Sequence, residues 1–192
     1  MTAHRSPQRR AARFAAGAAL VLLTACGGGD GAPAADATLD AAGGPEPRHN
    51  AADAAFLRAM IPLHREAVEL AGLAPGRAAT TDVDDLAGRV VATQEPEIAT
   101  MTDWLADWDE PAPDPGAPGD DAVDELSATD GEAFDAAFLT LMIDRHETAV
   151  DLAGTELSGG VHEPARELAE AVITTRTAEI GAMTALLNDI TG

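Results

Sequence analysis

The chain has 192 residues, the length of a single domain, and its 33 acidic residues outnumber 12 basic ones, all arginine, giving a net charge of −21. A chain this acidic has no basic surface to neutralise phosphates, which argues against nucleic acid as a partner. A solvated acidic surface that keeps the protein soluble accounts for the charge.

The N-terminus is typical of an export signal. Four arginines precede a short apolar run, Phe14–Leu23, which is too short to span a bilayer as a helix. The run ends in Leu23-Thr24-Ala25-Cys26, which resembles a bacterial lipobox. We therefore interpret residues 1–26 as a lipoprotein signal peptide with Cys26 as the lipid-attachment residue, so that a membrane is the partner and the location is extracytoplasmic. A secretory signal with an incidental cysteine is the alternative.

The next segment, residues 27–50, consists mainly of Gly, Ala, Pro and Asp. Because it has almost no large apolar residue to bury, we expect a disordered tether. Cys26 has no second cysteine to pair with, so the folded part, residues 51–192, must be held together by packing.

The folded part contains an internal repeat. Asp53–Gly72 (DAAFLRAMIPLHREAVELAG) recurs 82 residues later as Asp135–Gly154 (DAAFLTLMIDRHETAVDLAG), and the same offset holds through the segments that follow. A register kept over this length indicates a duplicated unit.

Apolar residues at steps of three and four predict four helices, over 51–73, 82–108, 130–157 and from Pro164 to 190. A Pro-rich linker over 109–129 joins a first hairpin, 51–108, to a second, 130–190. No alternating strand pattern is found. These observations predict an all-α fold, a four-helix bundle made of two related hairpins. Trp104 and Trp108 are expected to cover one end of it.

Each predicted helix turns one ionisable side chain and one Met toward the core. The ionisable residues are His64, Glu97, His146 and Glu179, and the methionines are Met60, Met101, Met142 and Met183. Buried carboxylates need partners. A metal ion is one solution, and Met would suit a soft ion such as Cu(I), although Met also fills helical cores. A metal-free network is the other, because Arg176 shares a face with Glu179 and would repel a cation. Asp53 and Asp135 are interpreted as helix-capping residues.

At these residues the sequence resembles the CopM-like family, known as domain of unknown function 305. The first copy carries Met60-Ile61-Pro62-Leu63-His64 and Gln94-Glu95-Pro96-Glu97-Ile98 through Met101, and the second carries Met142-Ile143-Asp144-Arg145-His146 and Glu179-Ile180 through Met183. The resemblance implies a ferritin-like helical bundle outside the cytoplasm, in a family in which some members bind copper. This chain departs from the family pattern at Leu63, Arg145, Leu70, Leu152 and Arg176.

The residues and the resemblance together predict an exported, lipid-anchored domain that binds or buffers a transition metal at the cell envelope, with copper as the favoured metal. The alternative is a metal-free structural or protein-interaction module built on the Arg176 network. An enzyme is not expected, because the sequence shows no nucleophile–base pair and no Glu-x-x-His motif. The identity of any protein partner is not encoded in these patterns.

Overall fold

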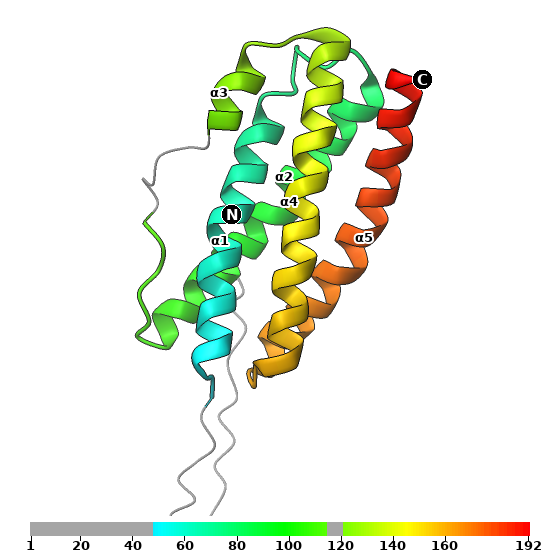
Figure 1. Cartoon of the computed structure of the whole chain (residues 1–192). Helices are drawn as coiled ribbons and strands as arrows, with labels where there is room; N and C mark the ends of the chain where they lie inside the picture. The colour runs from blue at the N-terminus through cyan, green and yellow to red at the C-terminus, as the bar shows by residue number, and fades with distance from the viewer. Residues whose placement is uncertain (1–47, 115–120) are drawn as a thin grey trace, which may run out of the picture. The chain divides into compact units, whose positions relative to one another are not determined.

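The computed structural model describes residues 48–114 and 121–192, which form five α-helices (Figure 1). The helices are α1 (Ala51–Gly72), α2 (Thr81–Asp107), α3 (Asp121–Ser127), α4 (Gly131–Gly159) and α5 (Glu163–Thr191). The described residues form no strand, and an isolated bridge pairs Ala78 with Gly131. The all-α prediction is confirmed. The predicted signal peptide, with Cys26, and most of the tether lie outside the described residues.

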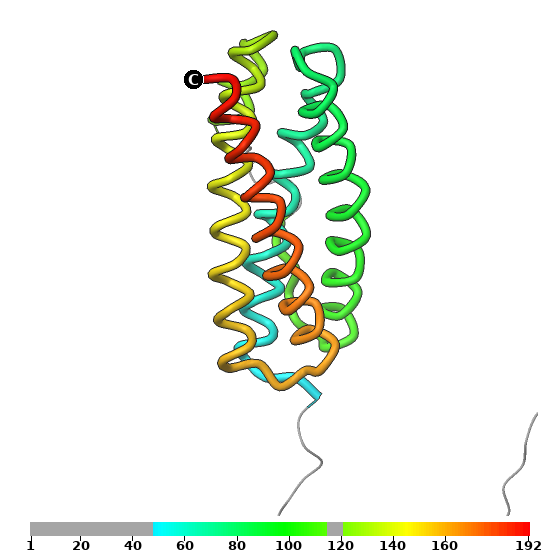
Figure 2. The backbone as a smooth tube through the Cα atoms, turned by 90° about the vertical axis from the view of Figure 1, so that its right-hand side faces the viewer, coloured from blue at the N-terminus to red at the C-terminus, as the bar shows by residue number. Residues whose placement is uncertain are grey.

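The four long helices lie side by side as two hairpins (Figures 1 and 2). α1 packs along α2, α4 packs along α5, and α1 also packs along α4. The connection from α2 to α4 contains α3, which contacts both α1 and α4. The predicted four-helix bundle is thus present, with one short helix added to it.

Local sequence signals explain where the helices begin. Asn50 caps α1 in a capping box with Asp53, and Thr80 caps α2 through its hydroxyl group. Pro164 lies in the first turn of α5, where a missing amide hydrogen costs nothing. Gly131 begins α4 with φ of 66°, a conformation that favours glycine, while its amide donates to the Arg77 carbonyl at 2.8 Å.

The helix α3 was not predicted from the periodicity. It has seven residues, and one of them, Leu126, is buried in the core. A helix this short provides a single inward position, so no repeating apolar pattern exists to reveal it.

The core consists of two hydrophobic clusters, one toward each end of the bundle. The lower cluster, toward the start of α1, contains Phe56, Leu57, Met60, Ile61, Met101, Leu105, Ala149, Ala153, Ala169 and Val172. The upper cluster, toward the start of α2, contains Leu70, Val83, Leu86, Val90, Leu126, Phe134, Phe138, Leu139, Met142 and Met183. None of the described helices has a run apolar and long enough to cross a bilayer.

Candidate functional site

A layer of polar side chains crosses the bundle between the two hydrophobic clusters. It consists of His64 on α1, Glu97 on α2, His146 on α4, and Arg176 and Glu179 on α5. Both imidazoles and the guanidinium are buried, whereas the glutamate side chains keep 17% and 22% of their surface exposed. We call these five residues the central layer.

Each histidine pairs with a glutamate of its own repeat. His64 Nε2 lies 2.8 Å from Glu97 Oε2, and His146 Nε2 lies 2.9 Å from Glu179 Oε2. A carboxylate only accepts hydrogen bonds, so each Nε2 carries a proton and donates it. The two pairs are thus the same interaction made twice, at positions related by the 82-residue offset.

Arg176 joins the two pairs at the centre of the bundle. Its Nη2 donates to Glu97 Oε2 at 2.8 Å, and its Nη1 donates to Glu179 Oε2 at 3.0 Å. The guanidinium is fully buried and bridges α5 to α2, so one cation serves two carboxylates from different repeats. The first repeat has Gln94 at the corresponding position, and Gln94 Oε1 and Arg176 Nε are both buried without a hydrogen-bond partner.

The electrostatics of the layer favour a neutral His64 and an ionised Glu179. Burial lowers the pKa of His64 more than the hydrogen bond to Glu97 raises it. Burial alone would raise the pKa of Glu179, but the hydrogen bond from His146 and the charge and hydrogen bond of Arg176 hold that pKa below its ordinary value. His146 and Arg176 together therefore favour the charged form of Glu179.

The central layer does not fit a metal ion. Oε2 of each glutamate accepts from both a histidine Nε2 and Arg176, and the guanidinium occupies the place between the carboxylates that a cation would need. The space between His64, His146, Gln94 and Arg176 has no room for a water molecule. No three His, Cys, Asp or Glu side chains in the described part of the chain are grouped so as to hold a metal.

The four candidate methionines are divided between the two hydrophobic clusters. Met60 and Met101 lie in the lower cluster, and Met142 and Met183 lie in the upper one, all fully buried. The structure therefore brings the histidines, glutamates and Arg176 together, but it does not gather the methionines around them.

Asp53 and Asp135 act across the boundary between the repeats. Asp53 Oδ1 accepts from the amides of Val161 and His162, both at 2.9 Å, just before α5. Asp135 accepts from the amides of Ala79 and Thr80 at 3.0 and 3.1 Å and from the Thr80 hydroxyl at 2.9 Å, just before α2. Each repeat thus holds the start of the other repeat's second helix, an arrangement we call the crossed clamps.

Rings cover the lower end of the bundle, where α1 begins. His49 stacks on Trp108 with ring centroids 4.3 Å apart, and His162 meets Trp108 and Trp104 edge-on at 4.8 and 5.2 Å. His162 links these rings to the Asp53 clamp, because its backbone amide donates to Asp53 Oδ1. The tether segment therefore contributes His49 and Asn50 to the fold.

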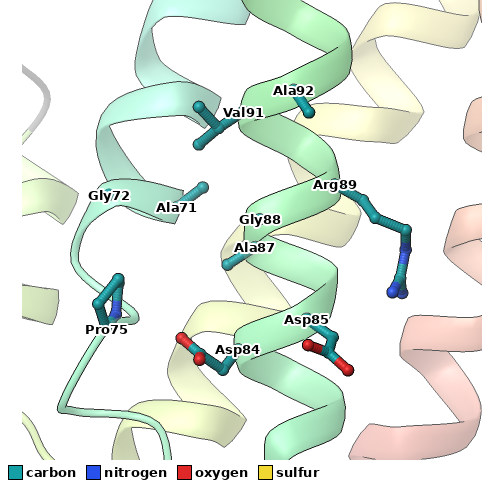
Figure 3. A pocket seen from close by; sticks show the side chains of 10 residues that line it. All are labelled: Ala71, Gly72, Pro75, Asp84, Asp85, Ala87, Gly88, Arg89, Val91 and Ala92. Atoms are coloured by element: carbon teal, nitrogen blue, oxygen red, sulfur yellow. The ribbon is translucent and has the colours of Figure 1, made fainter.

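A groove of about 600 Å³ lies on α1 and α2, near the end of α1 (Figure 3). Small side chains such as Ala71 and Ala87 line it, with the carboxylates of Asp84 and Asp85 and the Arg89 guanidinium on the α2 side. It includes no residue of the central layer or of the crossed clamps, so it is not part of the candidate site.

The sequence profile of one family, the domain of unknown function DUF305, matches residues 53–187, which include the central layer and both clamp aspartates. The chain belongs to this family. No curated protein matches the chain.

Solved structures share the fold of this DUF305 chain. A putative secreted DUF305 protein from Streptomyces coelicolor has 26% identity and a TM-score of 0.68, with 73% of this chain and 94% of that chain covered. CopM in its Cu(I)-bound form has 28% identity and a TM-score of 0.66, with 73% and 98% covered. A DUF305 fragment from Deinococcus radiodurans has 25% identity and a TM-score of 0.67, with 74% and 99% covered.

Proposed function

We propose that this protein is an exported, lipid-anchored DUF305 domain that serves as a metal-independent structural or protein-interaction module. The observation that carries the proposal is the Arg176 guanidinium, which binds Glu97 and Glu179 where a bound cation would lie. Cys26 is the proposed attachment point, and the similarity to a putative secreted protein from Streptomyces coelicolor supports an extracytoplasmic location.

The charge balance of the central layer supports this proposal. A metal ion at the two carboxylates would have to displace the Arg176 guanidinium, which is fully buried. Moving a buried cation out of its ion pairs is costly, and bringing a second cation beside it is more so. The Arg176 guanidinium thus neutralises the two carboxylates, as a bound metal ion does in other helical bundles.

Copper binding is the second candidate, because CopM has been solved in Cu(I)-, Cu(II)- and Ag-bound forms. In this chain it would use the histidines, glutamates and methionines of the two repeats, and it requires Arg176 to leave the centre. The two candidates therefore differ in what Arg176 does when copper is offered.

Calorimetric titration of residues 48–192 with Cu(I), Cu(II) and Zn(II) separates the candidates. The fragment can be tested alone, because the crystallised relatives consist almost entirely of the region that matches it. We expect no saturable binding by the wild-type fragment. One tight Cu(I) site that is lost in a His64→Ala/His146→Ala variant would overturn the proposal.

Arg176→Gln is the matched variant for this titration, since it places in the second repeat the residue that the first repeat has at Gln94. If the guanidinium is what excludes the metal, Arg176→Gln gains Cu(I) binding that the wild-type fragment lacks. Equal binding by the two fragments would show that Arg176 does not control access to the centre.

A further inference from the structure

The crossed clamps differ by one buried carboxyl group. Glu156 on α4, 1% exposed, lies against Asp53, whereas the corresponding position in the other clamp is Ala74. The Asp53 clamp also has Gly160 at the position that Ala78 occupies in the Asp135 clamp. A Cβ on Gly160 would overlap the Glu156 carboxyl and lie 2.7 Å from Asp53 Oδ1, so the glycine makes room for the extra group.

The contact between Asp53 and Glu156 requires a proton. Asp53 already accepts from the amides of Asn50, Val161 and His162. The two Glu156 oxygens have no hydrogen-bond donor, and two ionised carboxylates cannot bond to each other. A proton on Glu156 turns the contact into a hydrogen bond from Glu156 to Asp53.

We propose that Asp53 and Glu156 share a proton that fastens the turn over residues 159–162 to the start of α1, and that this proton latch opens as the pH rises. The latch also includes Asn50, whose Nδ2 donates to the Gly159 carbonyl at 2.8 Å. Opening it would loosen the end of the bundle at which α1 begins.

The surrounding groups assign the proton to Glu156. Burial, together with the hydrogen bond and charge of Asp53, raises the pKa of Glu156 to about 8, while Arg166 on α5 opposes the rise. Burial would also raise the pKa of Asp53, but hydrogen bonds led by the His162 amide hold it below its ordinary value. Burial lowers the pKa of the His162 ring, with the Asp53 charge opposing and His49 reinforcing that change.

The sign of the pH dependence follows from proton linkage. An exposed Glu156 titrates near its ordinary pKa of 4.5, and the latched one near 8. Between these values opening releases a proton, so the opening equilibrium rises by up to about tenfold per pH unit. Below this window the opening equilibrium is at its lowest, and above pH 8 it no longer changes with pH.

Amide hydrogen exchange of residues 48–192, corrected for intrinsic rates, tests the latch with an internal control. Protection of the Val161 and His162 amides is expected to fall by up to about tenfold per pH unit from pH 5 and to level off near pH 8. The Ala79 and Thr80 amides occupy the same places in the clamp that lacks the glutamate, so their protection is expected to stay constant.

Glu156→Gln completes the experiment. The amide is neutral at every pH and still donates to Asp53, so in the variant the protection of the Val161 and His162 amides should no longer fall as the pH rises. A parallel fall at both clamps, or a fall at Val161 and His162 that persists in Glu156→Gln, would overturn the proposal. So would a Glu156 carboxyl carbon that titrates near pH 4.5 in the wild-type NMR spectrum, a measurement that needs no variant.

Discussion

Arg176 and Gln94 occupy the same register in the two repeats, but they act differently on the carboxylates beside them. Glutamine is neutral and offers two weak donors, whereas the Arg176 guanidinium carries a charge and holds Glu97 and Glu179 at once. A single difference between the repeats therefore gives the two glutamates a shared guanidinium partner.

Replacing Arg176 by Gln should destabilise the fold. The two glutamates would then face each other without a cation, and breaking a buried ion pair costs about 3–5 kcal/mol. Because both glutamates are partly exposed, we expect the lower end of that range, about 3 kcal/mol. Urea denaturation of residues 48–192 at pH 7 measures this loss in the free energy of unfolding.

Arg89→Gln is the control for this measurement, because Arg89 is exposed on α2. We expect it to change the free energy of unfolding by no more than about 0.5 kcal/mol. If the two variants unfold at the same urea concentration, Arg176 contributes no more than a surface charge.

Residue spacing predicted the inward direction of the central side chains but not their partners. The helical period places His64 and Glu97 on apolar faces, and the structure buries them between the clusters. Whether the glutamates bind a metal ion or Arg176 depends on the distances between helices. The apolar period of one helix gives no information about those distances. Glu156 was missed because it lies beyond the repeated segment, and only its mismatch with Ala74 could have indicated it.

At the scale of elements, long helices were easier to predict than short ones. The four long helices begin and end within two residues of the predicted bounds, because each of them has more than five turns of apolar period. The helix α3 has a single buried residue, and its stability comes from the surface it covers on α1 and α4.

Truncating that buried residue tests whether α3 belongs to the core. Leu126 is 2% exposed within the upper cluster, so Leu126→Ala should lower the free energy of unfolding by about 2–3 kcal/mol, as measured by urea denaturation. The exposed neighbour Glu125 is the control, and Glu125→Ala should change it by no more than about 0.5 kcal/mol. Equal effects would mean that α3 does not pack on the bundle.

For the whole molecule, the attachment point determines where the acidic domain is found. If Cys26 carries the lipid, the wild-type protein should sediment with membranes after cell breakage, because acyl chains are buried in the bilayer. Cys26→Ser should move it to the soluble fraction. A wild-type protein that is already soluble, or a variant that stays with the membranes, would contradict lipid anchoring.

The crossed clamps also bear on how the halves depend on each other. Asp53 precedes the segment that connects the two hairpins, and it accepts hydrogen bonds from amides that follow this segment. Asp135 follows the segment, and it accepts hydrogen bonds from amides that precede it. A protease cut within residues 115–120 would sever the polypeptide without removing a contact between α1 and α4 or either clamp. The two pieces would stay associated as a nicked, native-like heterodimer, and neither piece alone could supply the acceptor that its own second helix requires.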